Sequence, residues 1–159
     1  MCKNRWWKMI ARNLNAFLDA IAKSEGTWGK GDDGYDVLVG GKFFNSYADH
    51  PRIAVDLPKL GIKSTAAGRY QILARYFDVY KKQLGLKDFG KASQDAIAVQ
   101  LIRECHALED IEKGRIEEAI KKCASRWASL PNAGYGQHEQ SMNFLVSAYK
   151  QAGGMVSIG

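Results

Sequence analysis

The chain has 159 residues, of which 46% are hydrophobic and 25% charged, a balance typical of a globular domain. This composition argues against disordered, collagen-like and mucin-like chains. The length corresponds to a single domain over residues 1–159. A formal charge of +6 suits an anionic partner, but it does not distinguish nucleic acid, a membrane surface and the bacterial cell wall.

The apolar segments of the chain are short. The longest uninterrupted one, Ala96–Val99, is far below the roughly 20 residues that cross a bilayer, so we expect no stable membrane insertion. Residues 1–12 form a basic N-terminal extension. The apolar stretch behind it is interrupted by Asn15 and Asp19 and lacks the continuous core of a secretory signal. We therefore expect synthesis in the cytoplasm.

The first predicted element is an amphipathic helix from about Ala11 to Ser24, ended by Gly26. It is indicated by four apolar residues at helical spacing: Leu14, Phe17, Leu18 and Ile21. Residues 26–34 contain four glycines and two aspartates, which predicts a loop directly after this helix.

A small antiparallel sheet is predicted next. Residues 35–39 and 42–44 have strand patterns on either side of the glycine pair at 40–41, which predicts a hairpin. The segment 51–58 begins and ends with proline and is predicted to be irregular. Residues 61–65 can supply a third strand.

Helical spacing of apolar residues predicts helices for the rest of the chain, from Ser64 onward. The predicted apolar faces cover residues 70–84, 97–108, 116–130 and 142–149. The fold class is therefore α+β, with one helix, a small antiparallel sheet and then a mostly helical body.

Glu25 is the most informative residue, because it places a carboxylate on an apolar face. It lies four positions after Ile21 and seven after Leu18, so helical geometry aims it along the apolar stripe. Apolar surroundings and the negative end of the helix dipole both raise a carboxyl pKa, which prepares a general acid to hold its proton near neutral pH. The alternative is that the helix frays at Gly26 and the side chain turns into water.

Three aspartates follow Glu25 within 11 residues: Asp32, Asp33 and Asp36. Glycosidases commonly place two carboxylates across the scissile bond, so Asp36 is a candidate partner for Glu25. The alternative is that the first two aspartates are solvated turn residues and Asp36 supports the loop.

Residues 64–71 read Ser-Thr-Ala-Ala-Gly-Arg-Tyr-Gln and predict the start of a helix. Free N–H groups, small residues and the Tyr70 and Gln71 side chains suit a hydroxylated, amide-bearing ligand such as an N-acetyl sugar. In the structural alternative, Ser64 or Thr65 is simply an N-cap and Tyr70 is a core residue.

The segment 131–137 contains two glycines, a tyrosine and a glutamine. It is either a mobile lip over a groove or a connection between helices, and its composition does not separate the two.

The histidines and cysteines form no motif for metal binding or nucleophilic catalysis. The sequence has no H-x-x-x-H pair, no G-x-S-x-G elbow and no C-x-x-C spacing among its three cysteines, so we expect no metal site. Cys105 and Cys123 fall on apolar stripes and are predicted to be buried, unreactive thiols. The lysine pairs at 81–82 and 121–122 are typical of solvated helix faces, so we expect no nucleic-acid partner.

Several segments in chain order together resemble a known family: Ser24-Glu-Gly-Thr27, Gly34-Tyr-Asp-Val37, Val39-Gly-Gly41, Asp49-His-Pro-Arg52, Lys63-Ser-Thr65, Ala67-Gly-Arg-Tyr-Gln71, Lys82-Gln-Leu-Gly-Leu-Lys-Asp-Phe89, Ser93-Gln-Asp-Ala96, Trp127-Ala-Ser-Leu-Pro131 and Ala133-Gly-Tyr-Gly-Gln137. The chain resembles the lysozyme-like endolysins of lambda-type bacteriophages from about residue 16 to 154. Residues 1–12, which include Trp6 and Trp7, have no clear counterpart in that family.

The resemblance implies a lysozyme-like fold of two lobes with a peptidoglycan groove between them, and a lytic transglycosylase activity without metal or cofactor. The single catalytic glutamate of the family lies in its S-E-G-T motif, which corresponds to Glu25 here. Two further family motifs flank the sugar groove and imply these substrate contacts: Ser64, Thr65, Gly68, Tyr70, Gln71, Tyr135 and Gln137. The resemblance also implies host lysis, with a separate holin admitting the enzyme to the periplasm.

The expected reaction cleaves the β-1,4 bond between N-acetylmuramic acid and N-acetylglucosamine and leaves a 1,6-anhydro end. Glu25 would protonate the departing O4 and then accept the proton of the muramic acid O6. One alternative is a hydrolytic muramidase that uses Glu25 and Asp36; the other is a basic, non-catalytic module that binds cell wall or nucleic acid. We expect a monomer whose partner is the peptidoglycan strand.

Overall fold

The computed structural model describes residues 2–158, with the side chains of residues 8–158. The chain forms two compact units. The first contains the residues up to Ser24 and those from Gln100 onward, and the second is the intervening segment Glu25–Val99. The chain therefore leaves the first unit directly before Glu25 and returns to it within a helix.

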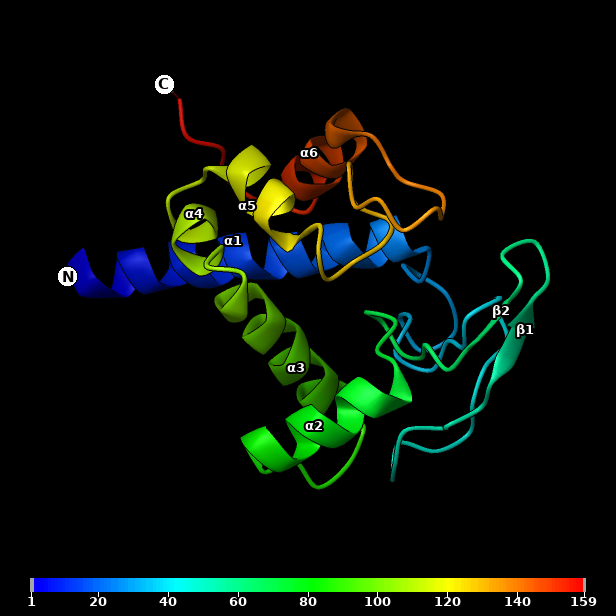
Figure 1. The fold of residues 1–159 in the computed structure, drawn as a ribbon. Coiled ribbons are helices and arrows are strands. Elements are labelled where there is room, and N and C mark those ends of the chain that lie inside the picture. Colours follow the sequence, from blue (N-terminus) through cyan, green and yellow to red (C-terminus); the bar gives the residue numbers. More distant parts are fainter. Residues whose placement is uncertain (1, 159) are drawn as a thin grey trace. The chain divides into compact units, whose positions relative to one another are not determined.

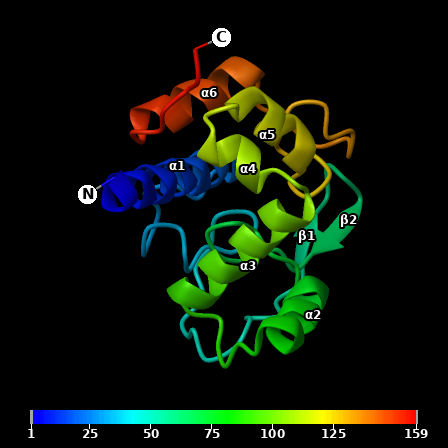
Figure 2. The same cartoon turned by 90° about the vertical axis from the view of Figure 1, so that its left-hand side faces the viewer.

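The first unit is helical. It contains α1 (Cys2–Glu25) up to Ser24, α4 (Leu108–Glu112), α5 (Ile116–Cys123) and α6 (Met142–Gln151), and Figures 1 and 2 show the three shorter helices alongside α1. Its largest fully buried side chains come from these helices, from the end of α3 (Lys91–Glu104) and from the segment after α5: Phe17, Ile21, Ile102, Ile111, Ile116, Ile120, Leu130 and Tyr149. The apolar stripe predicted for the first helix is thus confirmed as a core face.

The helix α1 begins earlier than expected. Its first residue is Cys2 rather than Ala11, because residues 2–10 contain neither proline nor glycine and nothing in that stretch interrupts a helix. The basic extension is therefore a continuation of α1, although the side chains of Trp6 and Trp7 lie outside the described part. No helix among the described residues is long and apolar enough to span a membrane.

The second unit holds the strands. β1 (Val55–Leu57) and β2 (Ile62–Ser64) pair antiparallel, with Val55 opposite Ser64 and Leu57 opposite Ile62. Two helices complete the unit: α2 (Ala74–Leu84) and the first part of α3 (Lys91–Glu104). Figure 1 shows the strands and α2 as separate parts of this unit.

Aromatic rings form the core of the second unit. Phe77 and Phe89 are fully buried and their ring centroids are 5.1 Å apart, with the His50 ring 4.8 Å from Phe89. The Nε2 atom of His50 donates to the carbonyl of Ile72 at 2.8 Å, while Nδ1 accepts the N–H of Arg52 at 3.0 Å. Burial lowers the pKa of His50, which agrees with this neutral tautomer. His50 is thus a core residue that supports the chain at Ile72.

The turn of the predicted hairpin is confirmed, but the prediction of two strands beside it is wrong. Gly40 and Gly41 both have positive φ angles, as the turn requires, but a single bridge, Val37 to Phe43, joins the two arms. Leu38 instead bridges to Ala67, far along the chain. The third predicted strand is confirmed as β2, and its partner β1 lies in the segment expected to be irregular.

The helix expected from Ser64 is wrong, because α2 begins at Ala74. Between Ser64 and Ala74 the chain makes a tight turn, in which Gly68 and Gln71 have positive φ angles and Ala67 bridges to Ile72. A hydroxyl cap does exist, since Thr65 Oγ1 accepts the N–H of Ala74 at 3.0 Å. The cap reaches α2 through space rather than from the adjacent residue.

Two later helices are shorter than predicted. α3 ends at Glu104, and His106 with a φ of +57° separates it from α4. α5 ends at Cys123, whereas Trp127 and Leu130 are buried in an irregular segment. Apolar spacing therefore reported burial correctly at these residues but not helix length.

A buried ion-pair cluster joins α4 to α5 in the first unit. Asp110 is only 3% exposed, and its carboxylate accepts hydrogen bonds from Arg115 at 2.8 Å and Lys122 at 2.6 Å. Burial alone would raise the pKa of Asp110, but the hydrogen bonds from Lys122 and Arg115 outweigh it and hold the pKa below its usual range. The charged form of Asp110 thus stabilises the fold.

We predict that Asp110→Asn lowers the free energy of unfolding at pH 7 by about 2 kcal/mol, because it removes the buried charge to which Arg115 and Lys122 donate, while both cations remain partly solvated. The pKa is lower in the folded than in the unfolded state. The stabilisation is therefore present above the unfolded pKa and is lost as the pH falls through the folded one.

Urea denaturation of the wild-type protein and of Asp110→Asn at pH 7 and pH 3 measures this effect. The difference between their free energies of unfolding should be smaller at pH 3. The matched control is Glu109→Gln, because Glu109 pairs with Lys113 on the exposed face of the same helix and its loss should leave stability unchanged. Equal effects of the two substitutions would show that the Asp110 cluster is not stabilising.

Candidate functional site

Glu25 is held between two anchored neighbours. It is the last residue of α1, and Gly26 ends the helix with a φ of +76°. Before it, the hydroxyl groups of Ser24 and Ser129 hydrogen-bond at 2.7 Å within the first unit. After it, Thr27 Oγ1 donates to the carbonyl of Arg69 at 2.6 Å within the second unit. The backbone at Glu25 is therefore fixed from both sides.

The helix continues through Glu25, so the fraying considered from the sequence does not occur. The side chain is half-buried, as an apolar-face position predicts. It also lies in the final turn of α1, where the helix dipole is negative.

Arg69 is the centre of the second unit and was not predicted as a functional residue. Its side chain is 4% exposed, and its guanidinium lies 5.3 to 5.6 Å from the ring centroids of Trp28, Tyr35 and Tyr70. It also donates from Nε to the carbonyl of Asp33 at 3.1 Å. One buried cation thus joins the loop after Glu25 to the turn at residues 68–72.

Tyr70 is a support for this cation. The side chain is 1% exposed, its hydroxyl donates to Asp95 Oδ1 at 2.6 Å, and the same hydroxyl accepts from Arg69 at 3.1 Å. Tyr35 donates to the same Asp95 oxygen at 2.8 Å. Burial and the Asp95 carboxylate raise the pKa of Tyr35 to about 12 and raise that of Tyr70 further. This geometry favours the core alternative for Tyr70.

Gly68 and Gln71 shape the turn. Gly68 is buried with a φ of +83°, and a Cβ there would collide with the side-chain amide of Gln94. The Gln71 amide nitrogen donates to the carbonyl of Gly68 at 2.9 Å and to that of Val37 at 3.3 Å. The turn is thus closed by its own side chain.

Gln94 was also missed from the sequence. It is fully buried; Nε2 donates to the carbonyls of Tyr35 and Phe89 at 3.0 and 2.9 Å, and Oε1 accepts the N–H of Arg69 at 2.9 Å. A signal was present, because Gln94 precedes Ile97 by three residues and Leu101 by seven and so lies on an apolar helical face.

Asp36 is half-buried, and its Oδ1 atom accepts the N–H of Asp32 at 2.9 Å. The carboxylate thereby closes the loop that follows Thr27. Asp32 itself pairs with Lys91 at 2.7 Å and accepts from Tyr47 at 2.7 Å. These contacts favour the loop-supporting alternative for Asp36.

Ser64 and Thr65 are half-buried and lie before the turn. Ser64 Oγ accepts the N–H of Ala66 at 3.2 Å, and Thr65 Oγ1 accepts the N–H of Ala74. In both cases the oxygen acts as an acceptor, so the hydroxyl hydrogen is left to donate to another group. Both residues thus combine a structural bond with a polar hydrogen.

Tyr135 and Gln137 belong to the first unit. The Tyr135 side chain is 56% exposed although its hydroxyl donates to the carbonyl of Ser125 at 2.6 Å, and Gln137 is exposed. The loop that carries them is organised by Glu139, whose carboxylate accepts the N–H groups of Asn132 and Gly134 at 2.9 and 3.0 Å. Glu139 was not predicted. The loop is thus fixed at its start and exposes an aromatic ring beyond.

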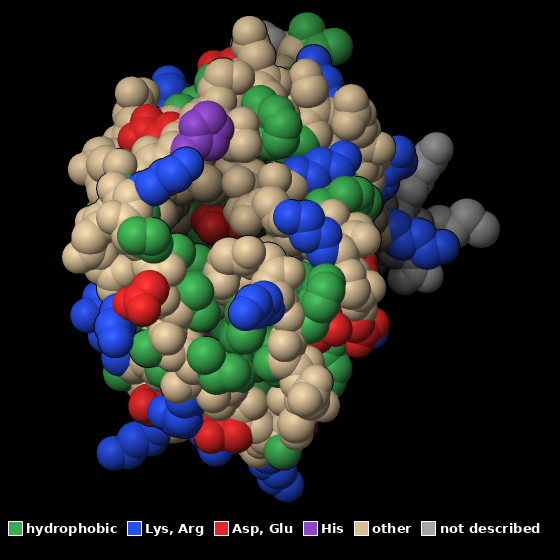
Figure 3. Space-filling view, turned by 90° about the vertical axis from the view of Figure 1, so that its right-hand side faces the viewer, with side chains coloured by type: hydrophobic (Ala, Val, Ile, Leu, Met, Phe, Trp, Pro, Cys, Tyr) green, Lys and Arg blue, Asp and Glu red, His purple; other side chains and the backbone are tan. Residues whose placement is uncertain are grey.

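The charges of the chain do not gather into one patch on the face shown in Figure 3. There, Lys and Arg side chains are interspersed with Asp, Glu and hydrophobic side chains. Among residues 8–158, no three or more His, Cys, Asp and Glu side chains form a group that could hold a metal ion. The electrostatics of this face thus give no continuous basic surface.

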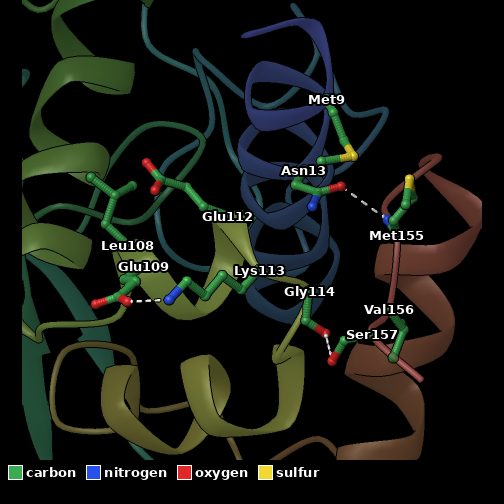
Figure 4. Close-up of a pocket in the computed structure, with 10 residues that line it drawn as sticks. All are labelled: Met9, Asn13, Leu108, Glu109, Glu112, Lys113, Gly114, Met155, Val156 and Ser157. Carbon is green, nitrogen blue, oxygen red and sulfur yellow. Dashed lines mark hydrogen bonds and ion pairs between the residues drawn. The ribbon is translucent and has the colours of Figure 1, made fainter. Parts of the chain in front are cut away.

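A pocket of about 760 Å³ lies in the first unit, between α1, α4 and the C-terminal tail (Figure 4). None of the residues that line it was predicted as catalytic or as a substrate contact. Within it, the buried Asn13 donates to the carbonyl of Ile111 at 3.1 Å and accepts the N–H of Met155 at 3.0 Å. Asn13 therefore has a structural role, which is to hold the tail against α1 and α4.

A family model described as Endolysin matches residues 15–156. The chain is 55% identical over 152 residues to the Endolysin of Escherichia phage lambda, covering 92% of this chain and 95% of that protein. It is 49% identical over 156 residues to the Endolysin of Escherichia phage P2, covering 91% and 94%.

Two solved structures are also similar to this chain over most of its length. Bacteriophage lambda lysozyme complexed with a chitohexasaccharide matches with a TM-score of 0.89 and 52% identity, covering 92% of this chain and 97% of that one. A second structure, lysozyme from bacteriophage lambda, matches with a TM-score of 0.83 at the same identity and coverage. The expected lysozyme-like fold is confirmed.

We predict that Gly68→Ala is more destabilising than Gly85→Ala, which is the matched control. Both glycines have positive φ angles, and an L-residue there costs about 1–2 kcal/mol. At Gly85 a Cβ meets nothing within 4 Å, whereas at Gly68 it meets the Gln94 amide and the Phe89 ring, which adds about 1–3 kcal/mol. Urea denaturation measures both, and equal losses would mean that the packing around Gly68 is not rigid.

Proposed function

This chain belongs to the endolysin family, and on that premise we propose that it is a phage endolysin with lytic transglycosylase activity. It would cleave the β-1,4 bond between N-acetylmuramic acid and N-acetylglucosamine in peptidoglycan. The observation that carries this proposal is Glu25, a half-buried carboxyl at the end of α1 whose neighbours on both sides are fixed by hydrogen bonds.

The proposed reaction has two proton transfers, both at the Glu25 carboxyl. The protonated group donates to the glycosidic O4 as the C1–O4 bond breaks and C1 acquires oxocarbenium character. The resulting carboxylate then accepts the proton of the muramic acid O6 while that oxygen bonds to C1. No water is consumed, the carboxyl ends protonated as it began, and the new chain end is a 1,6-anhydro sugar.

Two features of the Glu25 environment support this double role. Half-burial and the carbonyl end of α1 both disfavour the ionised carboxyl before the bond breaks. The bonds at Ser24 and Thr27 restrict the backbone, so the carboxyl can be held in reach of the leaving oxygen without a large entropic cost. The muramic acid O6 is already part of the substrate, which gives it a high effective concentration at C1.

Several other side chains are proposed to contact sugar. Ser64 and Thr65 each keep a hydroxyl hydrogen, and the Gln71 amide oxygen remains as an acceptor because its nitrogen is used in the turn. The exposed Tyr135 ring can stack on a sugar face, and the Gln137 amide can bind an acetamido group. Gly68 is proposed to contribute indirectly, because the absence of a side chain there lets the turn pack against Gln94. Tyr70 is proposed to act indirectly, through Arg69.

The biological role proposed with this activity is host lysis. The enzyme would be made in the host cytoplasm as a monomer, with residues 1–159 serving as one catalytic domain. A separate holin would admit it to the periplasm, where its substrate lies. The bound chitohexasaccharide of the lambda lysozyme is a β-1,4-linked amino sugar and supports a glycan strand as the ligand.

A hydrolytic muramidase is the second candidate, with Asp36 assisting a water molecule. The same premise of family membership supports it, because a lysozyme and a transglycosylase cut the same bond. The contact that disfavours it is the hydrogen bond from the Asp32 N–H to Asp36 Oδ1, which gives one of the two carboxylate oxygens a structural role in the loop. The third candidate, a basic, non-catalytic binding module, would bind glycan strands without cleaving them.

We predict that Glu25→Gln lowers the lytic rate by about 10²- to 10⁴-fold, because the amide cannot donate or accept the transferred proton. Turbidity loss of chloroform-treated Gram-negative cells measures the rate, and thermal melting checks that the variant is folded. Glu117→Gln, an exposed glutamate on α5, is the control and should lyse at the normal rate. Lysis by folded Glu25→Gln at the normal rate would move the catalytic role to another residue.

We predict that digested peptidoglycan contains 1,6-anhydro muropeptides, each lighter by one water than the product of hydrolysis. Mass spectrometry of the products before and after borohydride treatment distinguishes the two, because only reducing ends gain hydrogen. Asp36→Asn should give the same products if Asp36 serves the loop. Reducing ends that disappear in Asp36→Asn would instead establish the muramidase.

A further inference from the structure

Two cysteines of the first unit are in contact where two helices end. Cys105 directly follows the last residue of α3, and Cys123 is the last residue of α5. The Cys123 thiol hydrogen-bonds to the sulfur of Cys105. Cys123 is fully buried, as the sequence predicted, but the prediction of burial is wrong for Cys105, which is half-exposed. One sulfur of the pair is thus accessible and the other is not.

The contact is held on both sides. Lys122, directly before Cys123, donates to the carbonyl of His106 at 3.3 Å. Arg126 lies 3.8 Å from the carboxylate of Glu104, which directly precedes Cys105. Each partner in these contacts comes from one of the two segments that carry the cysteines. These contacts hold the two segments that carry the cysteines next to each other.

The surroundings favour a thiolate at Cys105. The hydrogen bond from Cys123 lowers its pKa; burial opposes this, and hydrogen bonds from Arg126 and Ser125 lower the pKa further, to about 6. The same contact with Cys105, together with burial, raises the pKa of Cys123. The pair thus combines a partly exposed thiol whose pKa is lowered with a buried thiol whose pKa is raised.

We propose that Cys105 and Cys123 are a redox-active pair, in which Cys105 reacts with an external disulfide and Cys123 closes an internal disulfide bond. The inference stands on the contact between the two sulfurs and on the unequal access to them. It is independent of the glycan chemistry assigned to Glu25.

The reaction balances as thiol–disulfide exchange with a disulfide oxidant RSSR. The Cys105 thiolate attacks one sulfur of RSSR, forms a mixed disulfide and releases RS⁻. Cys123 gives its proton to the released RS⁻ and attacks the Cys105 sulfur, which releases the second RS⁻. The two cysteines are oxidised by two electrons, and RSSR is reduced to one thiol and one thiolate.

The bond would link the end of α3 to the end of α5 across the intervening α4. A cross-link of this kind restricts the unfolded chain and so favours the folded state. If the proposed route from cytoplasm to periplasm is correct, the pair would pass from a reducing to an oxidising compartment. The linkage would then form where the enzyme acts.

The test uses the Cys2→Ser protein, so that only the pair remains, with glutathione disulfide as the oxidant. After oxidation and alkylation, intact mass should show the loss of two hydrogens and no alkylation, and proteolytic peptides should show Cys105 joined to Cys123. Dithiothreitol should restore two alkylated thiols. A protein that keeps both thiols, or that forms only disulfide-linked dimers, would overturn the proposal.

Two matched variants separate the roles of the sulfurs. In the Cys2→Ser background, Cys123→Ser should hold a stable glutathione adduct on Cys105, because no second thiol resolves it. Cys105→Ser should form the adduct at least 10-fold more slowly, because Cys123 is buried and protonated. Equal adduct formation by both variants would contradict the assignment. If either variant folds poorly, the mass measurement on the Cys2→Ser protein, which keeps both Cys105 and Cys123, still decides the proposal.

Discussion

The buried guanidinium of Arg69 is the interaction on which the second unit depends. Its side chain is 4% exposed, faces three aromatic rings and donates to the carbonyl of Asp33. Its own backbone carbonyl accepts from Thr27, two residues after Glu25, and its N–H is bound by Gln94. A buried cation is costly unless it is satisfied in this way. The segment that follows the proposed acid is therefore tied to the rigid turn at residues 68–72.

This arrangement separates residues that support the proposed site from residues that are proposed to contact a sugar. The Tyr70 hydroxyl donates a hydrogen bond to Asp95 and accepts one from Arg69, both inside the second unit. One carboxylate oxygen of Asp36 likewise accepts a hydrogen bond from the backbone of its own loop. Polar residues of a recognisable motif thus serve two functions, because a buried backbone turn needs hydrogen-bond partners as much as a ligand does. Glu25 lies between two such residues, Ser24 and Thr27, whose hydroxyl hydrogen bonds fix the backbone on either side of it.

Local patterns predicted the elements whose cause is local. The apolar stripe of α1 and its end at Gly26 follow from side-chain spacing and from the conformational freedom of glycine, as does the turn at Gly40. The strand β1, the bridge from Leu38 to Ala67 and the early end of α5 were missed. In each of these cases the backbone follows partners distant in the chain, and apolar spacing reports only that a residue is buried.

The sequence by itself determined the α+β class, the family and the position of Glu25 on the apolar face of the first helix. These rest on composition, periodicity and a series of motifs, all of which are read along the chain. Only the tertiary structure decided that Arg69 and Gln94 form a buried hydrogen-bonded centre, that Thr65 caps a helix nine residues away, and that Cys105 meets Cys123. The physical reason is that hydrogen bonds and thiol contacts depend on distances of a few ångströms in space, which spacing along the chain does not specify.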